Sequence, residues 1–106
     1  MTRPVIAIHG GAGMLGASLR RWHDVYAAGL AQALVSGYRI LEEGGACLDA
    51  VSAAVVALED SPLFNAGRGA AYNAAGEHEL DAAIMDGETL LAGAVAAVNV
   101  PRMRTQ

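Results

Sequence analysis

A short aliphatic run, residues 5–8, passes directly into a glycine-rich segment with the sequence His9-Gly10-Gly11-Ala12-Gly13. Three of the four residues in the run are β-branched, and such residues favour extended backbone. Glycine permits the positive φ angles that tight turns require and that other residues avoid. The pattern therefore predicts a buried strand that ends in a glycine loop.

The interior of the protein has to be built from small and aliphatic side chains. Of the 106 residues, 54% are hydrophobic but only 5% are aromatic. A chain of this length suits one compact domain, or one piece of a domain, and leaves little room for a second core. Such a composition is typical of closely packed α/β proteins and not of disordered chains.

Two helices are expected after the glycine loop. Apolar residues fall near helical spacing over 24–43, roughly five turns, and Gly44-Gly45 supplies the stop. A second helical stretch covers 47–59. It ends before Pro62, because proline disfavours helical backbone in the residue that precedes it. A glycine-containing loop, 64–69, follows.

The last third of the chain predicts antiparallel strands. Residues 70–73 and 77–85 flank Ala74-Ala75-Gly76 as the two arms of a hairpin. The turn signal Asp86-Gly87 then leads to a third apolar run, 90–98. We therefore expect the order strand, helix, helix and three antiparallel strands, which is an α/β (α+β) arrangement.

Charge and residue spacing exclude several kinds of partner. The net charge is -4, there is no lysine, and the seven arginines form no basic stripe, which excludes nucleic acid. Three histidines, at 9, 23 and 78, lack the spacing of a transition-metal site. Cys47 is the single cysteine, so an internal disulfide is excluded, and we interpret it as a small buried thiol.

We expect a soluble, cytoplasmic protein. The apolar run after Arg3 is too short for a signal peptide. No stretch approaches the ~18 uninterrupted apolar residues of a membrane-spanning helix.

Residues Gly11, Gly13 and Gly16 match the pattern GxGxxG of a dinucleotide-binding protein. That fold requires a second strand, with an acidic residue at its end, about 20 positions further on. The long helix is predicted in that region, so nucleotide binding is the weaker interpretation.

Two other nucleophile-based interpretations stay open. The His9-Gly10-Gly11 segment could form the oxyanion loop of an esterase, although no Gly-x-Ser-x-Gly elbow is present. Removal of Met1 would expose Thr2, whose own amine could serve as its base, although a fraying terminus argues against this role.

Five segments together resemble the plant-type asparaginase/isoaspartyl peptidase family, in that family's order and spacing, over approximately residues 4–98. The most specific are the glycine loop and Phe64-Asn65-Ala66-Gly67. The second of these belongs to a longer matching segment that runs from Leu58 to Gly69. The other three segments are Glu43-Gly44-Gly45-Ala46, Asp49-Ala50-Val51 and Glu79-Leu80-Asp81-Ala82-Ala83-Ile84-Met85-Asp86-Gly87.

The resemblance implies an N-terminal-nucleophile hydrolase with an αββα sandwich, of which residues 1–106 would be the first portion. In that family autoproteolysis releases a threonine as the first residue of a β subunit, and the α subunit carries the segment seen here. Gly10 and Gly11 would give catalytic support beside the nucleophile. Asn65 would hold the nucleophile-bearing segment through its amide. The alternative for Asn65 is a loop residue that caps its own backbone.

The same loop resembles the family's sodium-binding loop, so a structural sodium ion is implied and no other cofactor. Backbone carbonyl oxygens would surround the ion. The matching residues are Leu58, Glu59, Ser61, Phe64, Ala66 and Arg68.

The implied reaction is hydrolysis of L-asparagine to aspartate and ammonia, or of a β-aspartyl (isoaspartyl) peptide. The family's Gly-Thr-Val-Gly-type junction, which carries the nucleophile, is not among these residues, and 99–106 depart from the family pattern. We therefore expect the chain alone to be inactive. Its partners would be the remainder of the α subunit and the β subunit, with αβ units paired as a dimer. The alternative is a non-catalytic interaction fragment.

Overall fold

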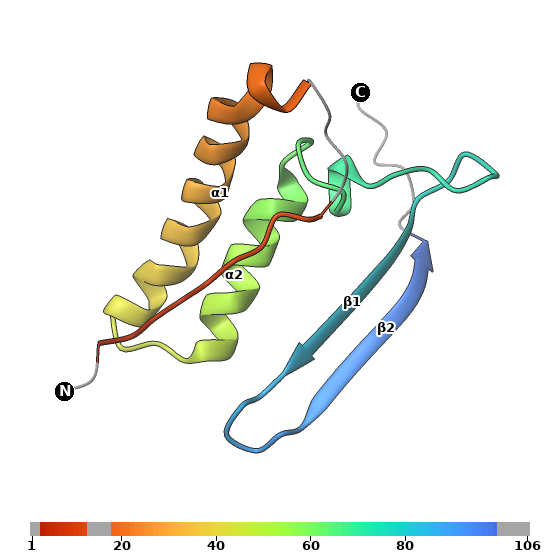
Figure 1. Cartoon of the computed structure of the whole chain (residues 1–106). Helices are drawn as coiled ribbons and strands as arrows, with labels where there is room; N and C mark the ends of the chain where they lie inside the picture. Colours follow the sequence, from red (N-terminus) through yellow and green to blue (C-terminus); the bar gives the residue numbers. More distant parts are fainter. Residues whose placement is uncertain (1–2, 13–17, 100–106) are drawn as a thin grey trace, which may run out of the picture.

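The computed structural model describes residues 3–12 and 18–99, with side chains from residue 21 onward in the second range. Two helices lead into a short 3₁₀ helix and then a two-stranded antiparallel sheet (Figure 1). The elements are α1 (Ser18–Glu42), α2 (Cys47–Asp60), η1 (Gly67–Gly69), β1 (Glu79–Met85) and β2 (Ala92–Asn99). This arrangement is consistent with the α/β class that the sequence predicts.

Helices α1 and α2 form a hairpin whose contact is made by small residues. Ala33, Ala50 and Ala54 are almost fully buried, at 0%, 1% and 2% exposure. A Cβ atom at Gly37 would lie 2.7 Å from the Ala50 carbonyl oxygen, so the two backbones approach closely. Small side chains let helices pack near the lower end of the usual 8–10 Å separation.

Helix α1 ends at the glycine pair that the sequence predicts as its terminus. Gly44 has a left-handed φ of 79°, and the Gly45 N–H donates to the Ile40 carbonyl oxygen at 2.8 Å. Only glycine takes this conformation without steric cost, which is why it closes helices so often. Helix α2 ends at Asp60, where Ser61 turns extended ahead of Pro62.

Two sequence predictions about the helices need correction. Helix α1 begins at Ser18, about two turns before the predicted residue 24. Residues 21–24 at its start are all exposed, so they present no apolar face that periodicity could reveal. Cys47 is exposed, not buried, because it occupies the first position of α2, ahead of Ala50, the first packed residue.

The predicted strand 5–8 is extended but pairs with no strand among the described residues. It runs along the two helices, apart from the β-hairpin (Figure 1). Ile6 packs at Gly37, where its Cδ1 atom lies 2.7 Å from the position of a Cβ. The segment is therefore held by apolar packing on the helices, since a β-ladder needs a hydrogen-bonding neighbour that the described chain does not place beside it.

Two of the three predicted antiparallel strands are formed, and the first is not. Residues 70–73 form no strand, because Asn73 closes a compact turn: its Oδ1 atom accepts from the N–H groups of Ala75 and Glu77, both at 2.9 Å. Strand β1 pairs antiparallel with β2, the predicted third apolar run, as the second turn signal predicts. The turn signal at Asp86 lies at the connection, where the Asp86 N–H donates to the Leu91 carbonyl oxygen at 2.9 Å.

The apolar side chains of the hairpin and of the facing side of α2 are incompletely covered. Val55 and Val56 on α2 are about half exposed, at 48% and 53%, as are Ile84 and Val95 on the hairpin, at 44% and 56%. A cleft of about 720 Å³ separates the two layers. In the described part of the chain, neither helix has the length and hydropathy needed to cross a bilayer.

Candidate functional site

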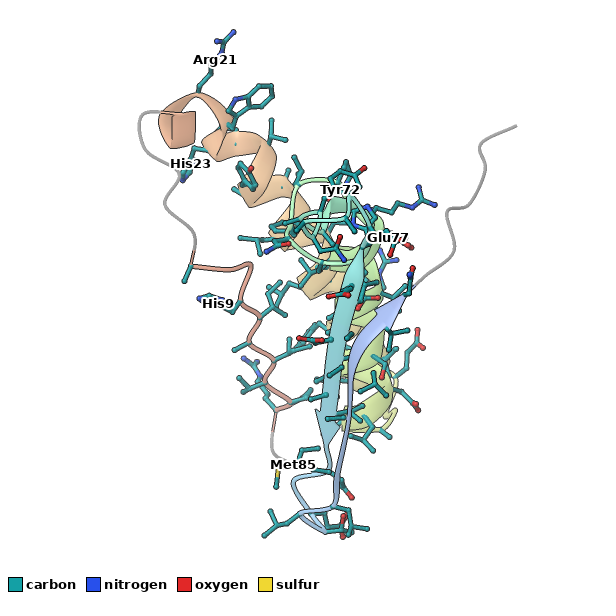
Figure 2. All side chains as sticks on the ribbon, turned by 90° about the vertical axis from the view of Figure 1, so that its right-hand side faces the viewer. His9, Arg21, His23, Tyr72, Glu77 and Met85 are labelled. Atoms are coloured by element: carbon teal, nitrogen blue, oxygen red, sulfur yellow. The ribbon has the colours of Figure 1, made fainter. Side chains whose placement is uncertain are left out.

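A second cleft, of about 710 Å³, is lined by the three residues predicted to support catalysis and by three of the six predicted sodium-site residues: Gly10, Gly11, Asn65, Leu58, Phe64 and Ala66. Its walls are residues 9–12, the first half of α1, and Leu58 with residues 63–66 after α2. These segments are far apart in sequence. Both His9 and His23 lie on the same side of the molecule, turned away from the hairpin (Figure 2).

Gly10 lets the glycine loop lie close to the side chains of Leu30 and Phe64. A Cβ atom there would lie 2.9 Å from the Leu30 Cδ2 atom and 3.1 Å from the Phe64 Cε1 atom. Contacts this short would force neighbouring side chains to move. The glycine loop is therefore seated directly on α1 and on the loop after α2.

Gly11 is required by the backbone conformation of the loop. Its φ is 116°, which side-chain-bearing residues rarely adopt, and a Cβ there would meet open space. The Gly11 N–H donates to the Nδ1 atom of His9 at 3.0 Å. This bond fixes the tautomer of a neutral His9, because Nδ1 can accept only when it carries no proton.

Phe64 joins the three walls of the cleft. It is only 4% exposed, its ring meets that of Tyr26 edge-on at 6.0 Å between centroids, and it contacts Gly10 and Gly29. An aromatic side chain buries more area than any alternative, so it can anchor a loop on its own. The family resemblance gives Phe64 only a carbonyl role, although the one phenylalanine in an aromatic-poor chain is a natural packing anchor.

Asn65 lies on the cleft wall but uses its carbonyl to close its own loop. Its Oδ1 atom accepts from the Ala71 N–H at 2.8 Å. Its amide nitrogen makes no hydrogen bond within residues 3–12 and 18–99. The loop-capping role is thus present, and the amide donor is left for another partner.

The six carbonyl groups of the implied sodium site belong to a strongly bent segment. The Leu58 carbonyl oxygen accepts from the Ser61 N–H at 3.3 Å, that of Phe64 from Ala66 at 2.8 Å, and that of Ala66 from Gly69 at 3.1 Å. Each carbonyl oxygen has a second lone pair that these bonds leave unused.

Two glycines let the backbone after the bend pack tightly against carbonyl groups of the implied sodium site. A Cβ at Gly67 would lie 2.5 Å from the Glu59 carbonyl oxygen, and one at Gly69 would overlap the Phe64 carbonyl oxygen. Hard oxygen donors on a sharply turned backbone fit a sodium or similar cation. The described residues contain no group of histidine, cysteine and carboxylate side chains suited to a transition metal.

Two cleft residues, His23 and Tyr26, were not predicted, and nothing in their spacing marked them. His23 forms a 3.2 Å pair with Asp24, and their side chains are 71% and fully exposed. Such exposed pairs contribute little. Tyr26 is half-buried against Phe64.

The dinucleotide-binding alternative gains no support from the fold. In the described chain α1 leads directly into α2, so the second strand that a dinucleotide site requires is not formed. Gly13 and Gly16 of the GxGxxG pattern, and Thr2, lie outside the described residues.

Comparison with known proteins points to one family. A family model described as asparaginase matches residues 2–103. The chain is 52% identical over 97 residues to an isoaspartyl peptidase/L-asparaginase of Homo sapiens, covering 90% of this chain and 30% of that protein. It is 50% identical over 101 residues to an isoaspartyl peptidase of Salmonella typhimurium, covering 93% and 32%.

A third relative, an isoaspartyl peptidase/L-asparaginase of Xenopus laevis, is 47% identical over 96 residues, covering 91% of this chain and 30% of that protein. The chain thus spans about a third of the length of these curated relatives.

Proposed function

This chain belongs to the asparaginase family, and from that premise we propose that it supplies part of the active site of a hydrolase acting on β-aspartyl groups. The substrates are L-asparagine, which gives aspartate and ammonia, and β-aspartyl peptides, which give aspartate and an amine. Both present the same β-linked aspartyl carbonyl, so one site can serve both. The proposal includes the αββα sandwich of N-terminal-nucleophile hydrolases as the complete fold.

The observation that carries this proposal is the meeting of Gly10, Gly11 and the Asn65 side chain on one cleft. These are the residues that the family resemblance assigns to catalytic support, and they come from segments more than fifty positions apart. The free amide nitrogen of Asn65 can donate to an incoming polypeptide segment. Glycines at 10 and 11 let such a segment approach the backbone closely.

In the proposed reaction a threonine hydroxyl, supplied by a β subunit, attacks the amide carbon; the C–N bond breaks, and ammonia or the amine leaves with the hydroxyl proton. Water then hydrolyses the resulting acyl-enzyme, which releases aspartate and restores the threonine hydroxyl. The residues described above would position groups, and none of them is the nucleophile. A sodium ion on the carbonyl set of residues 58–68 would stiffen the loop that carries Phe64 and Asn65. We propose that the 106-residue chain alone has no hydrolase activity.

The test has two arms. In the first, the 106-residue chain with a carboxy-terminal tag is assayed for ammonia release from L-asparagine and for aspartate release from a β-aspartyl dipeptide, beside a Thr2→Ala variant. We expect no turnover. Activity that disappears in Thr2→Ala would overturn the inactivity proposal and identify Thr2 as the nucleophile.

In the second arm, residues 2–103 replace the matching third of the Salmonella typhimurium isoaspartyl peptidase. We expect this chimera to hydrolyse a β-aspartyl dipeptide and Asn65→Ala in the chimera to lose most activity. A folded, autoprocessed chimera whose activity is insensitive to Asn65→Ala would contradict the role proposed for that side chain.

A second candidate, an interaction fragment, is favoured by the half-exposed apolar residues between α2 and the hairpin. Apolar surface of this kind promotes association. Light scattering across a concentration series tests self-association through this surface, which a chain that stays monomeric would contradict.

A further inference from the structure

Within the glycine loop, the two backbone amides have different surroundings. The Gly11 N–H is taken by the His9 Nδ1 atom at 3.0 Å. The Gly10 N–H donates to no acceptor in the described part of the chain. The two amides are adjacent in sequence, and both residues line the same cleft.

We propose that His9 is a positioning residue that clamps the Gly11 amide and thereby leaves the Gly10 N–H as the free donor of the loop. The acceptor it would meet is a carbonyl or carboxylate oxygen. Only this assignment of the acceptor depends on the proposed function; the clamp itself stands on the geometry of this chain.

The clamp has a clear physical purpose. Gly11 has a φ of 116° with nothing within 4 Å of a Cβ position, so packing does not hold it there. A flexible glycine without a restraint samples many conformations. The hydrogen bond that the His9 imidazole accepts supplies this restraint. His9 is exposed, so it acts from the solvent side of the loop, whereas Gly10 is half-buried.

Within the described residues, packing, and not a hydrogen bond, holds the neighbouring Gly10. The Gly10 Cα atom is seated against Leu30 and Phe64, which leaves its backbone fixed by contact. One glycine is therefore held by packing and the next by a hydrogen bond. The polar groups facing His9 across the cleft are on α1, His23 and Tyr26, with Asn65 on the opposite loop.

Amide hydrogen exchange of the ¹⁵N-labelled 106-residue chain tests the proposal without substrate. Protection factors are compared for the unsubstituted chain, His9→Ala and His9→Asn, with His23→Ala as the matched control for a second histidine on the cleft. Asparagine keeps a side-chain acceptor that readily bonds the N–H two residues on.

We expect the Gly11 protection factor to fall by a factor of about 2 to 10 in His9→Ala, the range of one net hydrogen bond. It should recover in His9→Asn and be unchanged in His23→Ala. Gly10 should exchange at near its intrinsic rate in all four chains. Amides of α1 and α2 serve as an internal reference for folding.

Three results would overturn the inference. They are an unprotected Gly11 amide in the unsubstituted chain, equal Gly11 protection in His9→Ala, and strong protection of Gly10. None of them concerns hydrolysis, so failure of the clamp and failure of the proposed reaction are distinguishable.

Discussion

The Asp81 carboxylate accepts a hydrogen bond from the Ala97 N–H at 2.8 Å, across the hairpin. The strands pair Leu80 with Val98 and Ala82 with Val95, so two residues of β2 oppose one of β1 at this point. Ala97 has a φ of 53°. The carboxylate therefore supplies the partner that the strand ladder cannot offer at this β-bulge.

Replacing Asp81 by alanine should destabilise the hairpin by about 1 kcal/mol, because an N–H in a sterically unfavourable backbone loses its acceptor. Ala97→Gly should offset part of that loss by relieving the positive φ. Urea unfolding measures both. Equal free energies of unfolding for Asp81→Ala and the unsubstituted chain would show that solvent replaces the carboxylate at no cost.

The connection between β1 and β2 predicts a dependence of stability on pH. The Thr89 hydroxyl, donating to the Asp86 Oδ2 atom at 2.8 Å, and then the Glu88 N–H lower the pKa of Asp86 below its ordinary value of 3.8. A lowered pKa in the folded state stabilises the fold above pH ~4. That contribution is lost as the pH falls below 3.8 and through the folded pKa.

The difference in unfolding midpoint between the unsubstituted chain and Asp86→Asn isolates this group from the other carboxylates. We expect the difference to shrink as the pH falls through that window and to be smaller at neutral pH in the background of Thr89→Val. A difference that stays constant from pH 6 to pH 2 would contradict the hydrogen-bonding account.

Phe64 is the side chain whose loss should do most damage, because it is buried against Tyr26, Gly10 and Gly29. Phe64→Ala should cost about 3–5 kcal/mol, as large-to-small changes in cores do. In a chain with this little core, that cost could abolish the cooperative transition. Leu91→Ala is the control: Leu91 is 74% exposed, and its loss should change stability by less than about 0.5 kcal/mol.

The contact between the two helices gives a matched pair of glycine substitutions. Gly37→Ala should destabilise by about 1–3 kcal/mol, because its Cβ would lie 2.7 Å from both the Ala50 carbonyl oxygen and the Ile6 Cδ1 atom. Gly93→Ala, in β2, meets nothing within 4 Å and has no positive φ. Thermal unfolding should show no loss for Gly93→Ala.

Local signals predicted the helix ends and the pairing of β1 with β2, but they also predicted a strand over 70–73 that is not formed. Gly44-Gly45 and Pro62 mark helix ends through their own backbone chemistry, and the ends are where they predict. The Asp86-Gly87 turn signal marked the connection between β1 and β2, whereas residues 70–73 form no strand because the side chain of Asn73 closes a turn. A run of apolar residues does not show that a polar side chain at its end will close a turn.

The candidate site was predictable only in part, for a similar reason. Gly10, Gly11 and Asn65 were found through motif resemblance. The sequence does not show that His9 bonds to Gly11 or that Phe64 joins the walls, because both depend on how distant segments pack. The extended run 5–8 lacked its β-ladder because a ladder is a property of two segments and not of one.

Asn65 combines two roles that substitution can separate. Asn65→Asp keeps the acceptor for the Ala71 N–H, which lies 2.8 Å from Oδ1, but removes the amide donor; Asn65→Ala removes both. In the 106-residue chain we expect Asn65→Ala to lower stability by about 1 kcal/mol and the Ala71 amide to exchange faster, whereas Asn65→Asp should leave both unchanged. In the chimera, both variants should lose activity, since only the donor can hold a partner segment. If Asn65→Asp retained full activity, the side chain would act through its own loop alone.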